Sequence, residues 1–124
     1  MTAARQSMGR AAEELVARRL AADGWQIVER NARTRHGELD IVARDRHTLV
    51  FVEVKAGRRN TAIGPERPAL AVDARKQHRI RRLAAAWLAE RPHAPQCAQI
   101  RFDVVGVTFD RGQVVGIEHI RNAF

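Results

Sequence analysis

Hydrophobic and polar positions alternate along two neighbouring stretches in the middle of the chain, residues 37–45 (GELDIVARD) and 48–55 (TLVFVEVK). A period of two residues is typical of strands that bury one face. The segment between them, residues 45–48, is polar and suited to a tight turn. The pattern therefore predicts a β-hairpin over residues 37–55.

The rest of the pattern predicts two helices and three further strands. Residues 9–23 carry apolar side chains at helical spacing, and Gly24 is suited to end that helix. A second helix is expected from Asp73, as its N-cap, to about Glu90. The further strands are expected at residues 25–30, 99–107 and 114–120. The order helix, three strands, helix, two strands predicts a three-layer α/β fold with a mixed central sheet of about five strands.

The predicted hairpin gathers acidic residues. If Ile41 lies beside Val52, then Asp40 lies opposite Glu53, with Cβ atoms about 4.5–5.5 Å apart. Two carboxylates at that distance can bind one magnesium ion. Lys55, two residues after Glu53, emerges on the same face. The alternative is a solvated strand face, but carboxylates about 5 Å apart repel by roughly 3 kcal/mol at an effective dielectric near 20, which favours a metal site.

Composition strengthens this interpretation. The chain has 22 Lys plus Arg, and only Lys55 and Lys76 are lysines, which leaves 20 arginines. Lysine is a compact cation whose pKa shifts readily, so its use at position 55 suggests a specific chemical role. The net charge of +8 and the pI near 11.4 favour a polyanionic partner, nucleic acid before an anionic membrane.

Length and residue classes indicate one soluble domain. With 124 residues, 45% of them hydrophobic and 29% charged, we expect a flexible tail over residues 1–8 and a single domain over residues 9–124. No apolar run reaches the roughly 20 residues of a membrane span, and the tail lacks the apolar core of a signal peptide. We therefore expect a cytoplasmic protein. A single cysteine excludes an intramolecular disulfide and a multi-cysteine zinc site.

Further candidates lie outside the hairpin. Glu13 is at the edge of the first helix's apolar stripe, where a functional and a structural role are equally favoured. Lys76 lies one turn before Ile80 and should face the sheet. Basic residues also occur in a polar loop expected at residues 31–36 and in a candidate functional loop at residues 56–70. Arg75, Arg79 and Arg82 form a helical ridge that is either a solvated face or a phosphate contact.

These residues resemble a known family. The hairpin sequence GELDIVARDRHTLVFVEVK, preceded by GRAAEELVARRLAADGWQIVERN and followed by RFDVV, is similar to the bacterial YraN family of Holliday-junction-resolvase-like proteins, within the PD-(D/E)XK nuclease superfamily. The resemblance covers nearly the whole chain and implies a restriction-endonuclease-like α/β/α fold. Leu39 stands where the superfamily's name has proline, and Ala12 stands where relatives often have glycine.

The resemblance also implies roles. The catalytic candidates are Glu13, Asp40, Glu53, Lys55 and Lys76. The ligands of a Mg²⁺ or Mn²⁺ ion would be Asp40, Glu53, the Val54 carbonyl and, directly or through water, Glu13. Apart from the resemblance, the residues that we expect to position the nucleic-acid backbone are Arg33, Arg35, Arg58, Arg59, Arg75, Arg79 and Arg82.

The leading hypothesis is a metal-dependent endonuclease that acts on DNA, with branched DNA among its candidate substrates. Two alternatives stay open: a non-catalytic nucleic-acid-binding or adaptor module on the same fold, and an RNA-processing nuclease. A homodimer is plausible by analogy with resolvases that pair two active sites.

Overall fold

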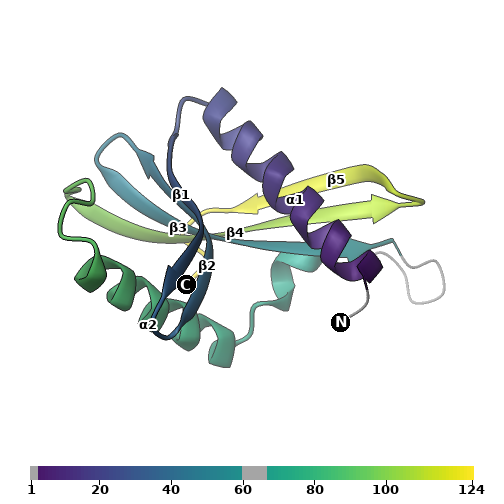
Figure 1. Cartoon of the computed structure of the whole chain (residues 1–124). Helices are drawn as coiled ribbons and strands as arrows, with labels where there is room; N and C mark the ends of the chain where they lie inside the picture. Colours follow the sequence, from purple (N-terminus) through teal and green to yellow (C-terminus); the bar gives the residue numbers. More distant parts are fainter. Residues whose placement is uncertain (1–2, 60–66) are drawn as a thin grey trace.

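A mixed five-stranded sheet forms the centre of the computed structural model, which describes residues 3–59 and 67–124 (Figure 1). The elements, in chain order, are α1 (Ala3–Ala22), β1 (Gln26–Thr34), β2 (Gly37–Asp45), β3 (Thr48–Arg58), the short 3₁₀ helix η1 (Pro68–Ala71), α2 (Ala74–Glu90), β4 (Gln99–Asp110) and β5 (Gln113–Ile120). This order confirms the predicted sequence of helices and strands. The η1 segment was not predicted.

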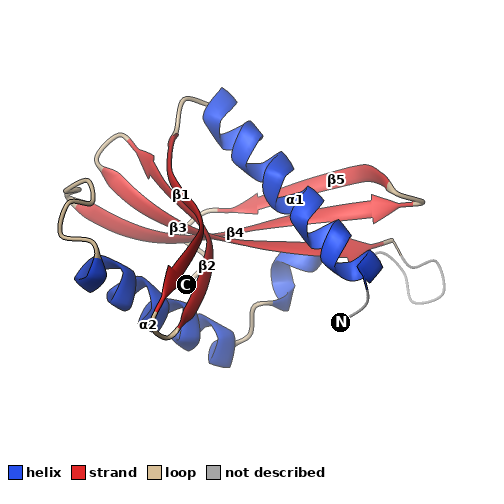
Figure 2. Cartoon of the chain, viewed as in Figure 1, coloured by secondary structure: helices blue, strands red, loops and turns tan. Residues whose placement is uncertain are grey.

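The strands lie in the order β1-β2-β3-β4-β5. Neighbours are antiparallel except β3 and β4, which are parallel because η1 and α2 carry the chain back between them. The β1–β2 ribbon twists strongly relative to the other strands (Figure 2). The sheet is therefore mixed, as expected.

The two helices cover opposite faces of this sheet (Figure 1). The stripe of α1, with Val16 and Leu20, packs in a core cluster that includes Val52 of β3. On α2, Leu83 and Trp87 pack in a second cluster of residues from the other face. Burial of apolar surface stabilises the fold by about 25 cal/mol per Å² on each face. The helices on opposite faces of the sheet confirm the predicted three-layer arrangement. Within the described residues, neither helix is long and apolar enough to cross a membrane.

The first helix and the first strand extend beyond their predicted boundaries. Residues 3–8, expected as a flexible tail, belong to α1, because they consist mainly of good helix formers and Met8 packs against the core. Residues 1–2 lie outside the described residues. Residues 31–34, expected in a loop, extend β1 and pair with β2; Ala32 is fully buried there, although its neighbours are polar.

The predicted register of β2 and β3 is confirmed in part. Ile41 pairs with Val52, as expected, but this pairing does not extend toward the β2 start. Leu39, expected on the same face as Ile41, instead packs in the cluster with α2. Asn31 accounts for this change of face. It lies on β1 between the pairs Arg30–Ile41 and Ala32–Leu39, and its left-handed conformation (φ 49°) bends the β1–β2 ribbon there. The bend separates the start of β2 from β3.

Candidate active site

The candidate site lies where β2 separates from β3. Beyond Val52, β3 continues to Arg58 beside β4, and within the described residues no strand pairs with residues 53–58 on the β2 side, so this edge is open. Asp40 reaches across this opening, and its Oδ2 accepts a hydrogen bond of 2.8 Å from Val54 N. The N–H and C=O groups of one strand residue point toward the same edge of the strand, so the Val54 carbonyl faces the opening as its N–H does. Asp40 thus takes the place of the missing strand partner.

Three carboxylates are crowded at this opening. Burial, a hydrogen bond with Glu53 and the charge of Glu53 raise the pKa of Asp40 to about 9. The hydrogen bond from Val54 N lowers this pKa but does not offset the rise. Burial also raises the pKa of Glu13, and the charge of Glu38 adds to this rise. Only 11% of the Glu53 side chain is exposed. Such crowded, weakly hydrated carboxylates are stabilised by a nearby cation.

Two lysines face these acids. Lys76 Nζ lies 3.2 Å from Glu53 Oε2, and Lys55 Nζ lies 3.9 Å from the same oxygen. Burial and the neighbouring Lys76 lower the pKa of Lys55. Burial also acts to lower the pKa of Lys76, but its hydrogen bond with Lys55 and the attraction of Glu53 raise it overall. Lys76 therefore holds its proton more strongly than Lys55.

Two glycines bring the start of α2 close to the sheet. A Cβ at Gly106 would lie 2.5 Å from Ala69 N, and one at Gly57 would lie 2.7 Å from Pro68 Cγ. These positions let η1 lie directly on β3 and β4 beside Lys55. Asp73 then caps α2 by accepting a 2.9 Å hydrogen bond from Lys76 N. Because η1 packs closely on the sheet, the start of α2 lies near β3 and the Lys76 side chain reaches Glu53.

Asn31 is a site residue that sequence reasoning missed. With its NH₂ group oriented toward the carboxylates, its amide nitrogen lies 3.0 Å from Glu13 Oε2 and 3.2 Å from Glu38 Oε1. Its left-handed backbone places it there. An asparagine within an otherwise polar stretch gives little signal, except that Asn adopts this conformation more easily than most residues.

The oxygen donors at the opening fit a magnesium or manganese ion. Asp40, Glu53 and the Val54 carbonyl offer two carboxylates and one carbonyl, and magnesium is commonly bound by one or two carboxylates, with water and substrate phosphate completing its shell. Across residues 3–59 and 67–124, no group of three or more His, Cys, Asp or Glu side chains is placed to hold a metal ion. The fit therefore involves two carboxylates, with Glu13 nearby rather than as a third close ligand.

The predicted arginine contacts fall into two separate places. On α2, Arg75, Arg79 and Arg82 are exposed, and Arg79 lies beside Gly37 in the turn that carries Arg33 and Arg35. We call these five arginines the α2 basic surface.

Arg58 and Arg59 lie elsewhere, at the end of β3. Together with Ala11, Phe109 and Arg111, they line a groove of about 500 Å³ under the first turns of α1. On a helix of 3.6 residues per turn, this groove and Glu13 lie on opposite sides of the buried stripe of α1. The loop expected to be functional includes residues 60–66, which lie outside the described residues.

Comparison with known proteins shows the family. The sequence model of one family, described as "Uncharacterised protein family UPF0102", matches residues 12–107. The chain belongs to this family. A UPF0102 protein of Frankia alni is 52% identical over 121 residues, which cover 98% of this chain and 97% of that protein. A UPF0102 protein of Geobacter metallireducens is 48% identical over 119 residues, with 96% and 93% covered. The stretch matched to the UPF0102 family includes every residue of the carboxylate and lysine cluster.

Proposed function

We propose that this UPF0102 protein is a magnesium- or manganese-dependent endonuclease of the PD-(D/E)XK type that cleaves phosphodiester bonds in DNA, with branched DNA among its substrates. The observation that carries the proposal is the hydrogen bond from Val54 N to Asp40 at the open edge of β3. It brings two carboxylates and an edge carbonyl next to a pair of lysines. A purely structural strand edge has little reason to bury such a set of charges.

Each residue of the cluster has a chemical role in this proposal. Asp40, Glu53 and the Val54 carbonyl would hold the ion, and Glu13 would contribute through water. When bound, the ion would polarise the scissile phosphate and lower the pKa of a coordinated water. Lys55 would donate a hydrogen bond to the attacking water or to the charge that develops on the phosphate.

Lys76 supports this arrangement from α2. Its contact with Glu53 at 3.2 Å fixes that carboxylate, and its positive charge favours a less protonated Lys55. The α2 basic surface would hold the nucleic-acid backbone by charge, without reading its sequence.

The test is a cleavage panel. Labelled four-way junction, flap, duplex and single-stranded DNA, and matching RNA, are incubated with purified protein in magnesium, manganese or EDTA. We expect metal-dependent cleavage of DNA by the wild-type protein. Asp40→Asn should reduce the rate at least about 100-fold while affinity changes only a few-fold. Glu14→Gln, which changes an exposed acid on α1, is the matched control.

The other outcomes separate the alternatives. Binding without cleavage by the wild-type protein in either metal would assign the fold to a binding or adaptor module. Cleavage of RNA alone would assign it to RNA processing. Equal cleavage by Asp40→Asn would place the reaction at another site.

A further inference from the structure

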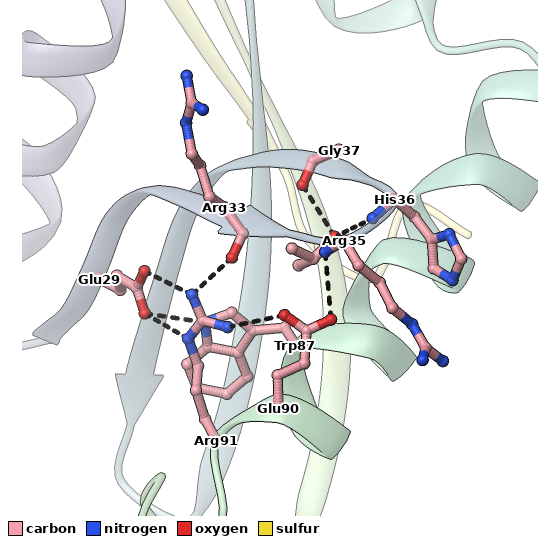
Figure 3. A network of polar contacts seen from close by, with 9 residues as sticks. Glu29, Arg33, Arg35, His36, Gly37, Trp87, Glu90 and Arg91 are labelled. Carbon is pink, nitrogen blue, oxygen red and sulfur yellow. Dashed lines mark hydrogen bonds and ion pairs between the residues drawn. The ribbon is translucent and has the colours of Figure 1, made fainter.

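A network of hydrogen bonds fixes the turn between β1 and β2 to the end of α2 (Figure 3). We call residues 33–37 the tip, and Glu29, Trp87, Glu90 and Arg91 the clamp. Arg91 bonds Glu29 through two nitrogens at 2.8 and 2.9 Å, and Trp87 Nε1 donates to the same carboxylate at 3.0 Å. The clamp thus joins β1 to the last turn of α2.

The clamp holds the tip only through its backbone. Arg91 donates a 2.7 Å hydrogen bond to the Arg33 carbonyl, and Arg35 N donates a 3.2 Å bond to Glu90 Oε2. Within the tip, Thr34 Oγ1 donates to the Gly37 carbonyl and accepts from His36 N. The side chains of Arg33, Arg35 and His36 point away from the network (Figure 3).

The charged groups of the clamp pair with one another, whereas those of the tip are exposed. The Glu29 hydrogen bond is the largest cause of the raised pKa of Arg91, and the same contact lowers the pKa of Glu29. Arg33 has an 89% exposed side chain and only a 4.0 Å contact with Glu38. Among the described residues, no carboxylate forms an ion pair with Arg35 or Arg79.

We propose that the clamp fixes the backbone of Arg33 and Arg35 beside Arg79, so that these three arginines can contact the phosphate backbone of double-stranded nucleic acid. Cations on a backbone that is already ordered lose less conformational entropy on binding than cations on a loose turn, and they gain most from a partner whose phosphates are also fixed. A duplex is such a partner, whereas a single strand must itself become ordered. The inference rests on the nucleic-acid ligand of the proposed function but not on cleavage, so binding is measured in EDTA.

The decisive variant removes a negative charge. Glu90→Ala breaks the bond to Arg35 N and raises the net positive charge by one, so simple electrostatics predicts tighter binding to DNA. The inference predicts the opposite, a several-fold loss of affinity for a fluorescent 20-base-pair duplex at 0.1 M salt. Glu14→Ala makes the same charge change on exposed α1 surface, outside the clamp, and should bind equally well or more tightly. Tighter binding by both variants would overturn the inference.

A thermodynamic cycle tests the positioning role of Arg91. Arg91→Ala and the double variant Arg33→Ala/Arg35→Ala should each weaken duplex binding about tenfold or more, since each phosphate contact adds to a steep salt dependence. Because the two changes disable the same array, combining them should cost little more than either alone. Additive losses would overturn the inference. If Arg91→Ala does not fold, Glu90→Ala carries the test alone.

The class of partner is tested with the same proteins. A 20-nucleotide single strand should bind the wild-type protein more weakly than the duplex, and Glu90→Ala should affect it less. An equal or greater effect on the single strand would overturn the assignment to duplexes. Duplex binding that depends on the clamp, without any cleavage, would contradict the endonuclease proposal and leave this inference standing.

Discussion

Lys55 and Lys76 are two similar side chains that reach the candidate site from different elements. Both contact Glu53, but Lys55 is on the strand beside the open edge and Lys76 reaches in from α2. Burial lowers the pKa of Lys55, whereas the contacts of Lys76 with Lys55 and Glu53 raise the pKa of Lys76 despite its burial. In the proposed function, the chemical step therefore belongs to Lys55 and the support of Glu53 to Lys76.

Substitution of each lysine by arginine tests this assignment. Lys55→Arg keeps the charge, but its wider guanidinium cannot place a single donor on the attacking water and competes for Glu53. We expect it to lose about 10²–10³ in cleavage rate. Lys76→Arg retains an ion pair with Glu53 and should lose less. A cleavage time course under saturating metal measures both, and near-wild-type activity of Lys55→Arg would refute the catalytic role.

We expect Asp40 to make the stability of the metal-free protein depend on pH. Burial and Glu53 raise its pKa in the folded state to about 9, above the ordinary value of 3.8. A carboxyl group with a raised folded pKa stabilises the fold below its unfolded pKa, and that contribution is lost as the pH rises through the folded value. In EDTA, the melting temperature should therefore fall from pH 5 toward pH 9 more steeply in the wild type than in Asp40→Asn.

The asparagine variant is a close control for that measurement. Its side-chain oxygen can still accept the hydrogen bond from Val54 N, so the local structure is kept. Identical pH profiles for the two proteins would show that Asp40 is not buried beside a second carboxylate. Addition of magnesium should raise the melting temperature of the wild type alone, since a ligand that binds only the folded state stabilises it.

The contact between η1 and the sheet sets the position of α2. Gly106→Ala would place a methyl group 2.5 Å from the Ala69 backbone nitrogen, so η1 must move away from β4. We expect a loss of about 1–3 kcal/mol in the free energy of unfolding, as for other overpacked sites, and slower cleavage because Lys76 shifts with α2. Urea denaturation and the cleavage assay measure the two effects.

Gly116→Ala is the matched control on the neighbouring strand. Its added methyl group would lie 3.9 Å from Thr108 Cβ, which is an ordinary contact. It should leave both the stability and the cleavage rate close to those of the wild type. Equal effects of the two substitutions would show that η1 is not seated on Gly106.

Local patterns predicted the elements because burial acts on neighbouring residues. Alternation around Ile41 and Val52 predicted both strands of the hairpin and their register. The same reasoning misplaced Leu39, since one left-handed residue, Asn31, rotates the end of the ribbon. A polar stretch carries no hydrophobic period, so the extension of β1 through residues 31–34 was also missed.

Contacts between distant parts of the chain were beyond sequence reasoning. Nothing in the sequence around Gly106 indicates that it lies against Ala69, because the two residues meet only after β3 and β4 pair in parallel. The separation of the arginines into the α2 basic surface and the groove near Arg58 depends on the same folding. The sequence predicted the chemical groups of the site, and the fold determines which of them lie together.

For the protein as a whole, we expect cleavage to depend on the carboxylate and lysine site and binding to depend on the α2 basic surface. The carboxylates are concentrated where β2 leaves β3, whereas exposed arginines extend over α2 and the tip. A nucleic acid held by the arginines would present its backbone to the lysines and the metal ion. Substitutions at the two regions should therefore affect affinity and rate separately.

The most direct measurement is the single-turnover cleavage rate of labelled four-way junction, flap and duplex DNA in saturating magnesium or manganese. It compares the wild type with Asp40→Asn, Glu53→Gln and the double variant. Because the two carboxylates would hold one ion, each single variant should fall to nearly the rate of the double variant, at least about 100-fold below wild type. A wild-type rate no higher than that of Asp40→Asn on every substrate and metal would contradict the proposed active site.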